Sequence, residues 1–223
     1  MNTQHTPILK RVGTLLLVIG LIDIVVMIYC IANRISYSSS FNIFAIVAGF
    51  FLLRGSLRAA SIVRWFAVFM LAAFFALLIA WPFMQPFALT LTQLRLNPGK
   101  SFAAFAFMAF CLCLLVWLTR ELGREPVLVA RASAGMKQRD MRIPAAIGVG
   151  LVIAMGIFMA LLLGGESADR AKSMAEQQVG PGFRFHVSSL NIAKNNQGTF
   201  VYGVVTAWND NEIRNISVHW EER

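Results

Sequence analysis

The stretch IPAAIGVGLVIAMGIFMALLLGGESADRAKSMAEQQV, residues 143–179, holds the change of composition that decides the fold. Residues 143–163 are apolar almost without interruption, and about 20 such residues are what a helix needs to cross roughly 30 Å of hydrocarbon. Two glycines end this run, and residues 166–179 are polar with apolar side chains at helical spacing. The sequence therefore predicts a transmembrane part, residues 1–165, followed by a small domain in water, residues 166–223.

Upstream of this point the chain is built from further apolar runs. Hydrophobic residues make up 57% of the 223 residues and charged residues 14%, and the mean hydropathy of +0.65 is typical of membrane proteins. The second run is apolar only over residues 41–53, so residues 36–40 and a snorkelling Arg54 must extend it. We therefore predict a polytopic α-helical membrane protein with about five transmembrane helices. The predicted spans are residues 12–32, 36–54, 62–81, 101–118 and 143–163.

The charge distribution predicts how these spans are oriented. The chain has 20 Lys and Arg residues against 11 Asp and Glu residues, and the excess lies within residues 1–165. Most of these cations lie at the N-terminus and in the second and fourth loops, which alternate with loops that contain few. The positive-inside rule then places the chain in the inner (plasma) membrane with its N-terminus in the cytoplasm and its C-terminal domain outside the cytoplasm, which in a bacterium is the periplasm. The pI of about 10.2 is thus a topology signal, and we expect no nucleic-acid partner.

The fourth loop, residues 119–142, is the largest basic segment. Cations at such a position attract anionic lipid head groups by about 1 kcal/mol each. Membrane lipids are therefore expected partners, although setting the topology is a sufficient reason for these charges.

Residues 166–179 predict the helix that opens the C-terminal domain. Ala168, Ala171 and Ala175 lie close to one face of this helix. The GPG sequence at residues 180–182 then ends it.

Three antiparallel strands are predicted after this helix, which makes the domain α+β. In the first strand Val187 and Leu190 have opposite parity, so both turn toward one face only if a β-bulge lies near residues 188–189. A domain of this size buries only about 60% of its unfolded surface, and we expect it to lean on a protein partner or a second copy. Its edge strands lack obvious proline or lysine guards, which leaves strand addition available. The candidate contact residues on the strands are Phe200, Tyr202, Trp208, Val218 and Trp220.

Asp23 is the candidate polar site within the membrane. It lies eleven residues into the first predicted span, where an ionised acid facing lipid costs at least about 2.5 kcal/mol. Asp23 is therefore either a proton or cation site, or a structural carboxyl that is hydrogen-bonded across the bundle to Tyr29, Ser61 or Thr14. We favour the structural role, because the other spans offer no acid, lysine, histidine or asparagine at a comparable depth.

Small residues recur at spacings of four in two of the predicted spans. Such faces let helix backbones approach closely, either within one bundle or between two copies. The positions are Ala72, Ala76 and Ala80, then Ala146, Gly150 and Ala154, then Gly156, Ala160 and Gly164.

The sequence offers little for catalysis. It contains no nucleotide-binding loop, no serine-hydrolase or zinc-protease motif, and no histidine within a predicted span. We therefore predict no enzyme, no catalytic residue, no cofactor and no metal site.

The leading functional hypothesis is a non-catalytic partner-binding protein of the inner membrane. It is either an accessory or assembly subunit of a membrane complex, or an immunity-type protein that protects its own membrane. The alternative is a small transporter or channel with Asp23 as its ionisable site.

Overall fold

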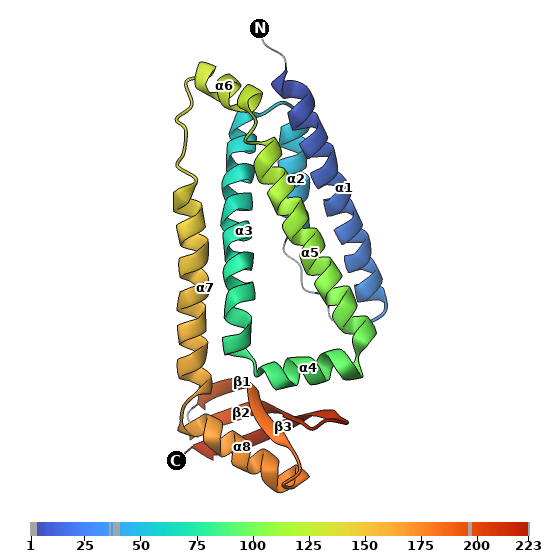
Figure 1. The fold of residues 1–223 in the computed structure, drawn as a ribbon, viewed down its shortest axis with the longest axis vertical. Helices are drawn as coiled ribbons and strands as arrows, with labels where there is room; N and C mark the ends of the chain where they lie inside the picture. The colour runs from blue at the N-terminus through green and yellow to red at the C-terminus, as the bar shows by residue number, and fades with distance from the viewer. Residues whose placement is uncertain (1–3, 36, 38–40, 196–197, 223) are drawn as a thin grey trace. The chain divides into compact units, whose positions relative to one another are not determined.

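The computed structural model describes residues 4–35, 37, 41–195 and 198–222. These residues form eight helices followed by a small antiparallel sheet (Figure 1). The helices are α1 (His5–Ala32), α2 (Phe41–Leu53), α3 (Leu57–Met84), α4 (Phe87–Leu96), α5 (Pro98–Glu121), α6 (Glu125–Ser133), α7 (Arg142–Leu163) and α8 (Glu166–Val179). The strands are β1 (Arg184–Asn195), β2 (Gly198–Trp208) and β3 (Ile213–Glu222).

Four of the helices, α1, α3, α5 and α7, are long enough and apolar enough to cross a membrane. The prediction of a fifth full-length span over residues 36–54 was wrong as to its length. The helix there, α2, has 13 residues and rises only about 20 Å, and it is followed at Gly55 by a turn with φ of +76°. Of the polar residues expected to extend it, Tyr37 is not helical, and residues 36 and 38–40 lie outside the described part of the chain.

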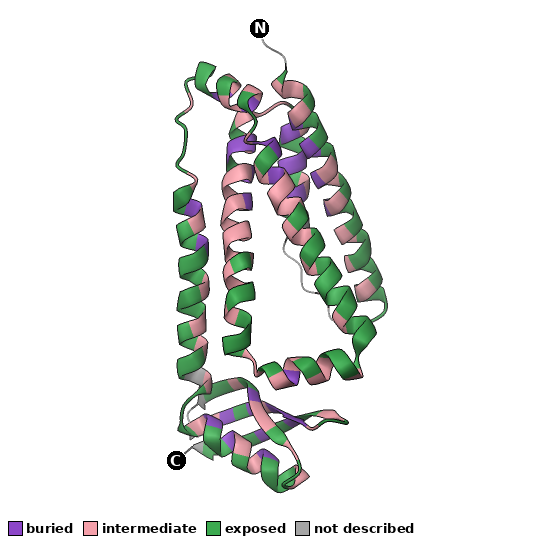
Figure 2. Ribbon diagram, in the orientation of Figure 1, coloured by how far each residue is buried: buried purple, intermediate pink, exposed green. Residues whose placement is uncertain are grey.

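The chain divides into two compact units, and each is described by itself. The first contains Met1–Ala72 and Cys111–Gly148. Its apolar core joins the beginning of α1, the end of α2, the beginning of α3, the end of α5 and α6. The fully buried residues of this core include Leu9, Val12, Leu52, Leu122 and Val127. Figure 2 shows these buried residues in purple, gathered where the ends of α1, α2, α3 and α5 meet.

Within this unit α1 and α2 approach each other closely at two glycines. A Cβ atom added to Gly13 would lie 2.8 Å from the carbonyl oxygen of Gly49, and one added to Gly49 would lie 2.8 Å from that of Gly13. Real Cβ atoms do not come so close, so the two backbones pack directly against each other at these glycines. Because Gly49 lies near the end of α2 and Gly13 near the beginning of α1, α2 brings the chain back toward the end where α1 starts.

The second unit contains Ala73–Phe110 and Val149–Arg223, and its apolar core lies in the C-terminal domain. The three strands form a simple meander in the order β1-β2-β3. The expected bulge is confirmed, because the β1–β2 register shifts between Val187 and Ser189. One face of α8 packs on the sheet, and the three alanines that the sequence places close to one face of this helix, Ala168, Ala171 and Ala175, are completely buried.

The small-residue faces predicted for α7 do not pack within this unit. No atom of the unit lies within 4 Å of the point where a Cβ of Gly150 or Gly156 would stand. Self-association through these faces therefore stays a prediction.

Candidate functional site

Asp23 is held by a residue outside the helices. The hydroxyl of Tyr37 donates a hydrogen bond of 2.6 Å to Asp23 Oδ1 and lies 3.3 Å from the Asp23 carbonyl oxygen. The expected partners Tyr29, Ser61 and Thr14 are thus corrected to Tyr37. The physical reason is that the chain turns back after α1, which brings the non-helical Tyr37 to the level of Asp23.

This contact gives Asp23 a half-buried position with a hydroxyl against its carboxyl group. The 2.6 Å between the Tyr37 hydroxyl oxygen and Asp23 Oδ1 is at the short end of O–H···O distances. The hydrogen bond from Tyr37 stabilises the carboxyl group inside an apolar helix.

The C-terminal sheet has two different faces. The face toward α8 is apolar, and it includes Val187, Val201, Val205 and Val218. The opposite face carries a shallow cleft of about 260 Å³. The residues lining this cleft are Ser189, Asn191, Tyr202, Gly203, Val204, Ser217, Val218 and His219.

Tyr202 is the prominent side chain of this cleft. It is 52% exposed and stacks with His219 of the neighbouring strand, with the ring centroids 6.5 Å apart. An aromatic ring held in place at an open surface loses little entropy on binding, which is why such rings are common in protein interfaces.

The structure places the five predicted contact residues in different surroundings. Val218 and Trp220 are buried on the face that α8 covers, and Arg170 of α8 lies over the Trp220 ring at 5.7 Å. Trp208 is also buried, at 5% exposure, while Phe200 is half-buried. Tyr202 is therefore the most exposed residue of this set.

The two edges of the sheet also differ. The bulge after Val187 interrupts the β1 edge, and bulges are a common protection against further strand pairing. β3 pairs with β2 in a continuous register from Ile213 to Glu222. Within the described residues neither strand has a second neighbour, so β3 offers the more regular edge for strand addition.

The histidines of this sheet do not come together. His186 lies on β1 and His219 on β3, with β2 between them. Burial lowers the pKa of His186, and the nearby Lys172 lowers it further. Among the described residues no three His, Cys, Asp or Glu side chains are close enough to hold a metal ion together.

Sequence reasoning missed a second polar site, in the fourth loop. There Arg131 is only 2% exposed and donates a hydrogen bond of 2.8 Å to Ser61 of α3. The signal was available, because Arg131 follows the core residue Val127 by four positions and so shares its helix face. The basic composition of the loop predicts the topology, and that role requires neither a helix nor a buried cation.

Comparison with known proteins gave no match. The chain matches no protein-family model, and no similar curated protein or solved structure was found.

Proposed function

We propose that this chain is a non-catalytic multi-pass protein of the inner (plasma) membrane whose C-terminal domain binds a protein partner outside the cytoplasm. The observation that carries the proposal is the open face of the sheet. The apolar core is completed by α8 on the other face, so the exposed Tyr202 and the cleft around it are not needed for folding.

A protein segment fits this surface better than a small molecule does. The cleft of about 260 Å³ is smaller than the roughly 300–1,000 Å³ of typical small-molecule sites. It lies beside β3, whose outer edge is regular. An extended segment that adds to β3 by main-chain hydrogen bonds can place one side chain against His219, which stacks on Tyr202 of the central strand.

The charge distribution supports an extracytoplasmic position for this domain. The core of the first unit joins the beginning of α1, the end of α2 and the beginning of α3, so these termini lie at one end of the unit. The cations Lys10, Arg54 and Arg58 belong to the same segments, as the positive-inside rule expects for the cytoplasmic end. Three further long helices, α3, α5 and α7, then carry the chain to the other side.

Such a protein acts by holding its partner at the membrane. This is the role of an accessory or assembly subunit, or of an immunity-type protein that intercepts an external toxin. Both roles need the same contact, and both are tested by the same experiment.

The test is crosslinking in cells from single photoreactive residues. We expect reporters at Tyr202 and Ser217, on the cleft and β3, to capture one partner in stoichiometric yield. The matched control is Gln177, which is exposed on α8 and belongs to the same domain. Mass spectrometry of the crosslinked species identifies the partner.

Two results would contradict the proposal. One is equal capture from Gln177 and Tyr202, which would indicate chance collisions. The other is crosslinking only to a second copy of the chain or to residues of the same chain.

A small transporter or channel is the second candidate, and the position of Asp23 within a long apolar helix favours it. The two candidates separate by substitution. Asp23→Asn abolishes transport that depends on a carboxylate but leaves partner capture at Tyr202 unchanged.

A further inference from the structure

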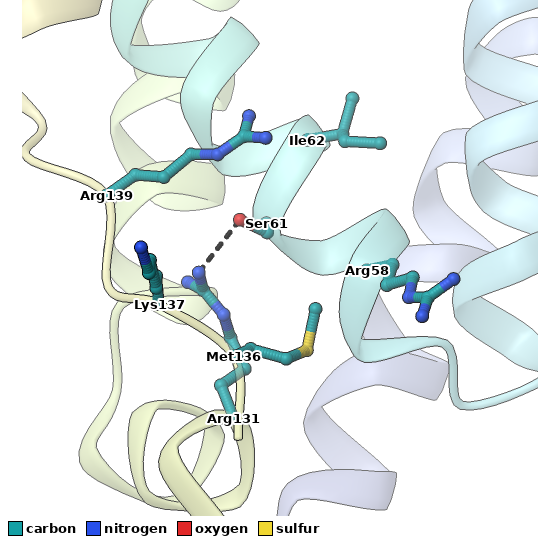
Figure 3. Close-up of a pocket in the computed structure, with 7 residues that line it drawn as sticks. All are labelled: Arg58, Ser61, Ile62, Arg131, Met136, Lys137 and Arg139. Carbon is teal, nitrogen blue, oxygen red and sulfur yellow. Dashed lines mark hydrogen bonds between the residues drawn. The ribbon is translucent and has the colours of Figure 1, made fainter. Parts of the chain in front are cut away.

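A basic pocket lies in the first unit, where the beginning of α3 meets the end of α6 and the segment that follows it. Its volume is about 320 Å³, within the range of small-ligand sites. The residues lining it are Arg58, Ser61, Ile62, Arg131, Met136, Lys137 and Arg139. In Figure 3 the Arg131 guanidinium points toward Ser61 and Lys137 lies on the same side, whereas Arg58 points away from this group.

Arg131 is the buried centre of the pocket. One of its terminal nitrogens, Nη2, donates to Ser61 Oγ at 2.8 Å, while its Nε is buried without a hydrogen-bond partner. Leaving a charged donor buried and unsatisfied is costly, by about 1–3 kcal/mol or more. The Arg131 guanidinium therefore lacks an acceptor for its Nε–H donor.

The charge around Arg131 is not balanced by acids. In the part of the chain that the structure describes, no pocket cation forms an ion pair. The buried Glu121 is paired with Arg124 at 2.8 Å, and Asp140 accepts a hydrogen bond from the backbone of Arg142. Burial lowers the pKa of Arg131, and the like charges of Arg64 and Arg139 lower it further.

The donor geometry matches a phosphate group. Arg131 lines the pocket with its Nη2 hydrogen-bonded to Ser61, and a guanidinium is the side-chain group best suited to bind phosphate oxygens. Ser61 Oγ accepts from Arg131, so its own hydroxyl proton remains to be donated to an anion. Lys137 and Arg139 supply further positive charge from an exposed segment.

The rim of the pocket indicates where the phosphate comes from. Ile62 lines the pocket and is 52% exposed on α3, a helix apolar enough to span a membrane. A phosphate bound here therefore has an apolar surface beside it that suits an acyl chain. We propose that this pocket binds the head-group phosphate of an anionic phospholipid.

Topology alone does not account for this arrangement. Cations that orient a membrane protein act while exposed at the interface, and Lys137 and Arg139 satisfy that description. Burying Arg131 against Ser61 adds nothing to orientation and costs desolvation energy. A bound anion offsets the desolvation energy of Arg131 by pairing with its positive charge.

The test is native mass spectrometry of the full chain, together with its thermal midpoint in neutral detergent. We expect phosphatidylglycerol to remain bound and to raise the midpoint, and phosphatidylcholine to do neither. Arg131→Met removes the guanidinium at similar length, and we expect at least about fivefold weaker retention, since each cation contributes roughly 1 kcal/mol. The matched control is Arg120→Gln, an exposed arginine of α5, which leaves retention unchanged.

A second variant guards against a folding defect. The double variant Lys137→Gln and Arg139→Gln changes only exposed residues and should also weaken retention severalfold. The proposal is overturned if both variants retain phosphatidylglycerol like the wild type, or if Arg120→Gln loses it equally. Inorganic phosphate is the third arm: a midpoint rise as large as that with phosphatidylglycerol would assign the pocket to free phosphate and overturn the lipid.

Discussion

The hydroxyl of Tyr37 explains how α1 carries an acid within a long apolar helix. Removing this hydroxyl takes away the 2.6 Å hydrogen bond to the half-buried Asp23 carboxyl group, and the loss of one such hydrogen bond costs about 0.5–1.5 kcal/mol. We therefore predict that Tyr37→Phe lowers the free energy of unfolding by that amount, measured by denaturant titration in micelles. Tyr29→Phe is the matched control and should have no effect, because Tyr29 is 62% exposed.

Asp23→Asn distinguishes a carboxyl group that only stabilises the fold from one that must carry a negative charge. The amide oxygen of asparagine still accepts the hydrogen bond from Tyr37, so a purely structural role predicts only a small loss of stability. A large loss of stability in Asp23→Asn, equal to that in Tyr37→Phe, would show that the negative charge itself is required.

His186 makes the stability of the C-terminal domain depend on pH. Its pKa is lowered in the folded state by burial and by Lys172, so below the ordinary value of about 6.5 the unfolded chain takes up the proton more readily. Stability is then complete above this pH and falls as the pH decreases. Hydrogen exchange of the strand amides, corrected for the intrinsic effect of pH, should show weaker protection at about pH 5.5 than at pH 7.5.

The control for this prediction is a pair of substitutions. His186→Gln should reduce the pH dependence, whereas His219→Gln, at an exposed position, should leave it as in the wild type. Equal behaviour of the two variants would assign the effect to other groups.

Among the elements, the crossing of α1 and α2 leaves no room for an added methyl group at Gly13. A Cβ on Gly13 would lie 2.8 Å from a backbone oxygen of α2. This steric clash can be removed only if the backbone of one of the two helices shifts. We predict that Gly13→Ala destabilises the chain by about 1–3 kcal/mol, the usual cost of overpacking. Gly150→Ala is the matched control, since its Cβ meets no atom of its own unit within 4 Å and alanine favours the helix. A neutral Gly13→Ala in thermal unfolding would contradict the direct backbone contact.

Elements with a periodic signal were predictable from the sequence. The long apolar runs predicted four spanning helices, the alanine spacing predicted the buried face of α8, and the parity change after Val187 predicted the bulge. The prediction for residues 36–54 was longer than α2, because residue composition does not show where a helix begins, and Tyr37 is not helical. The pairs Tyr37–Asp23 and Arg131–Ser61 were missed because each joins segments whose meeting depends on tertiary packing.

At the scale of the whole molecule, the short α2 decides the topology. If α2 and the segment before it complete a crossing, the chain passes the membrane five times, and the C-terminal domain lies opposite the N-terminus. If they do not, every later segment changes sides. The return of α2 to Gly13 and the positive-inside rule both favour the first arrangement.

Labelling of single cysteines with a membrane-impermeant reagent tests this in the full-length chain, after the native cysteines are replaced by serine. With five crossings, cysteines at Gln85 and Asn211 should react in intact cells, and those at Ser56 and Ala134 only after permeabilisation. Four crossings predict the inverse pattern at all of these sites, provided the N-terminus is cytoplasmic. The inverse pattern would also place Tyr202 and its cleft in the cytoplasm, and the proposed partner would then have to be a cytoplasmic protein.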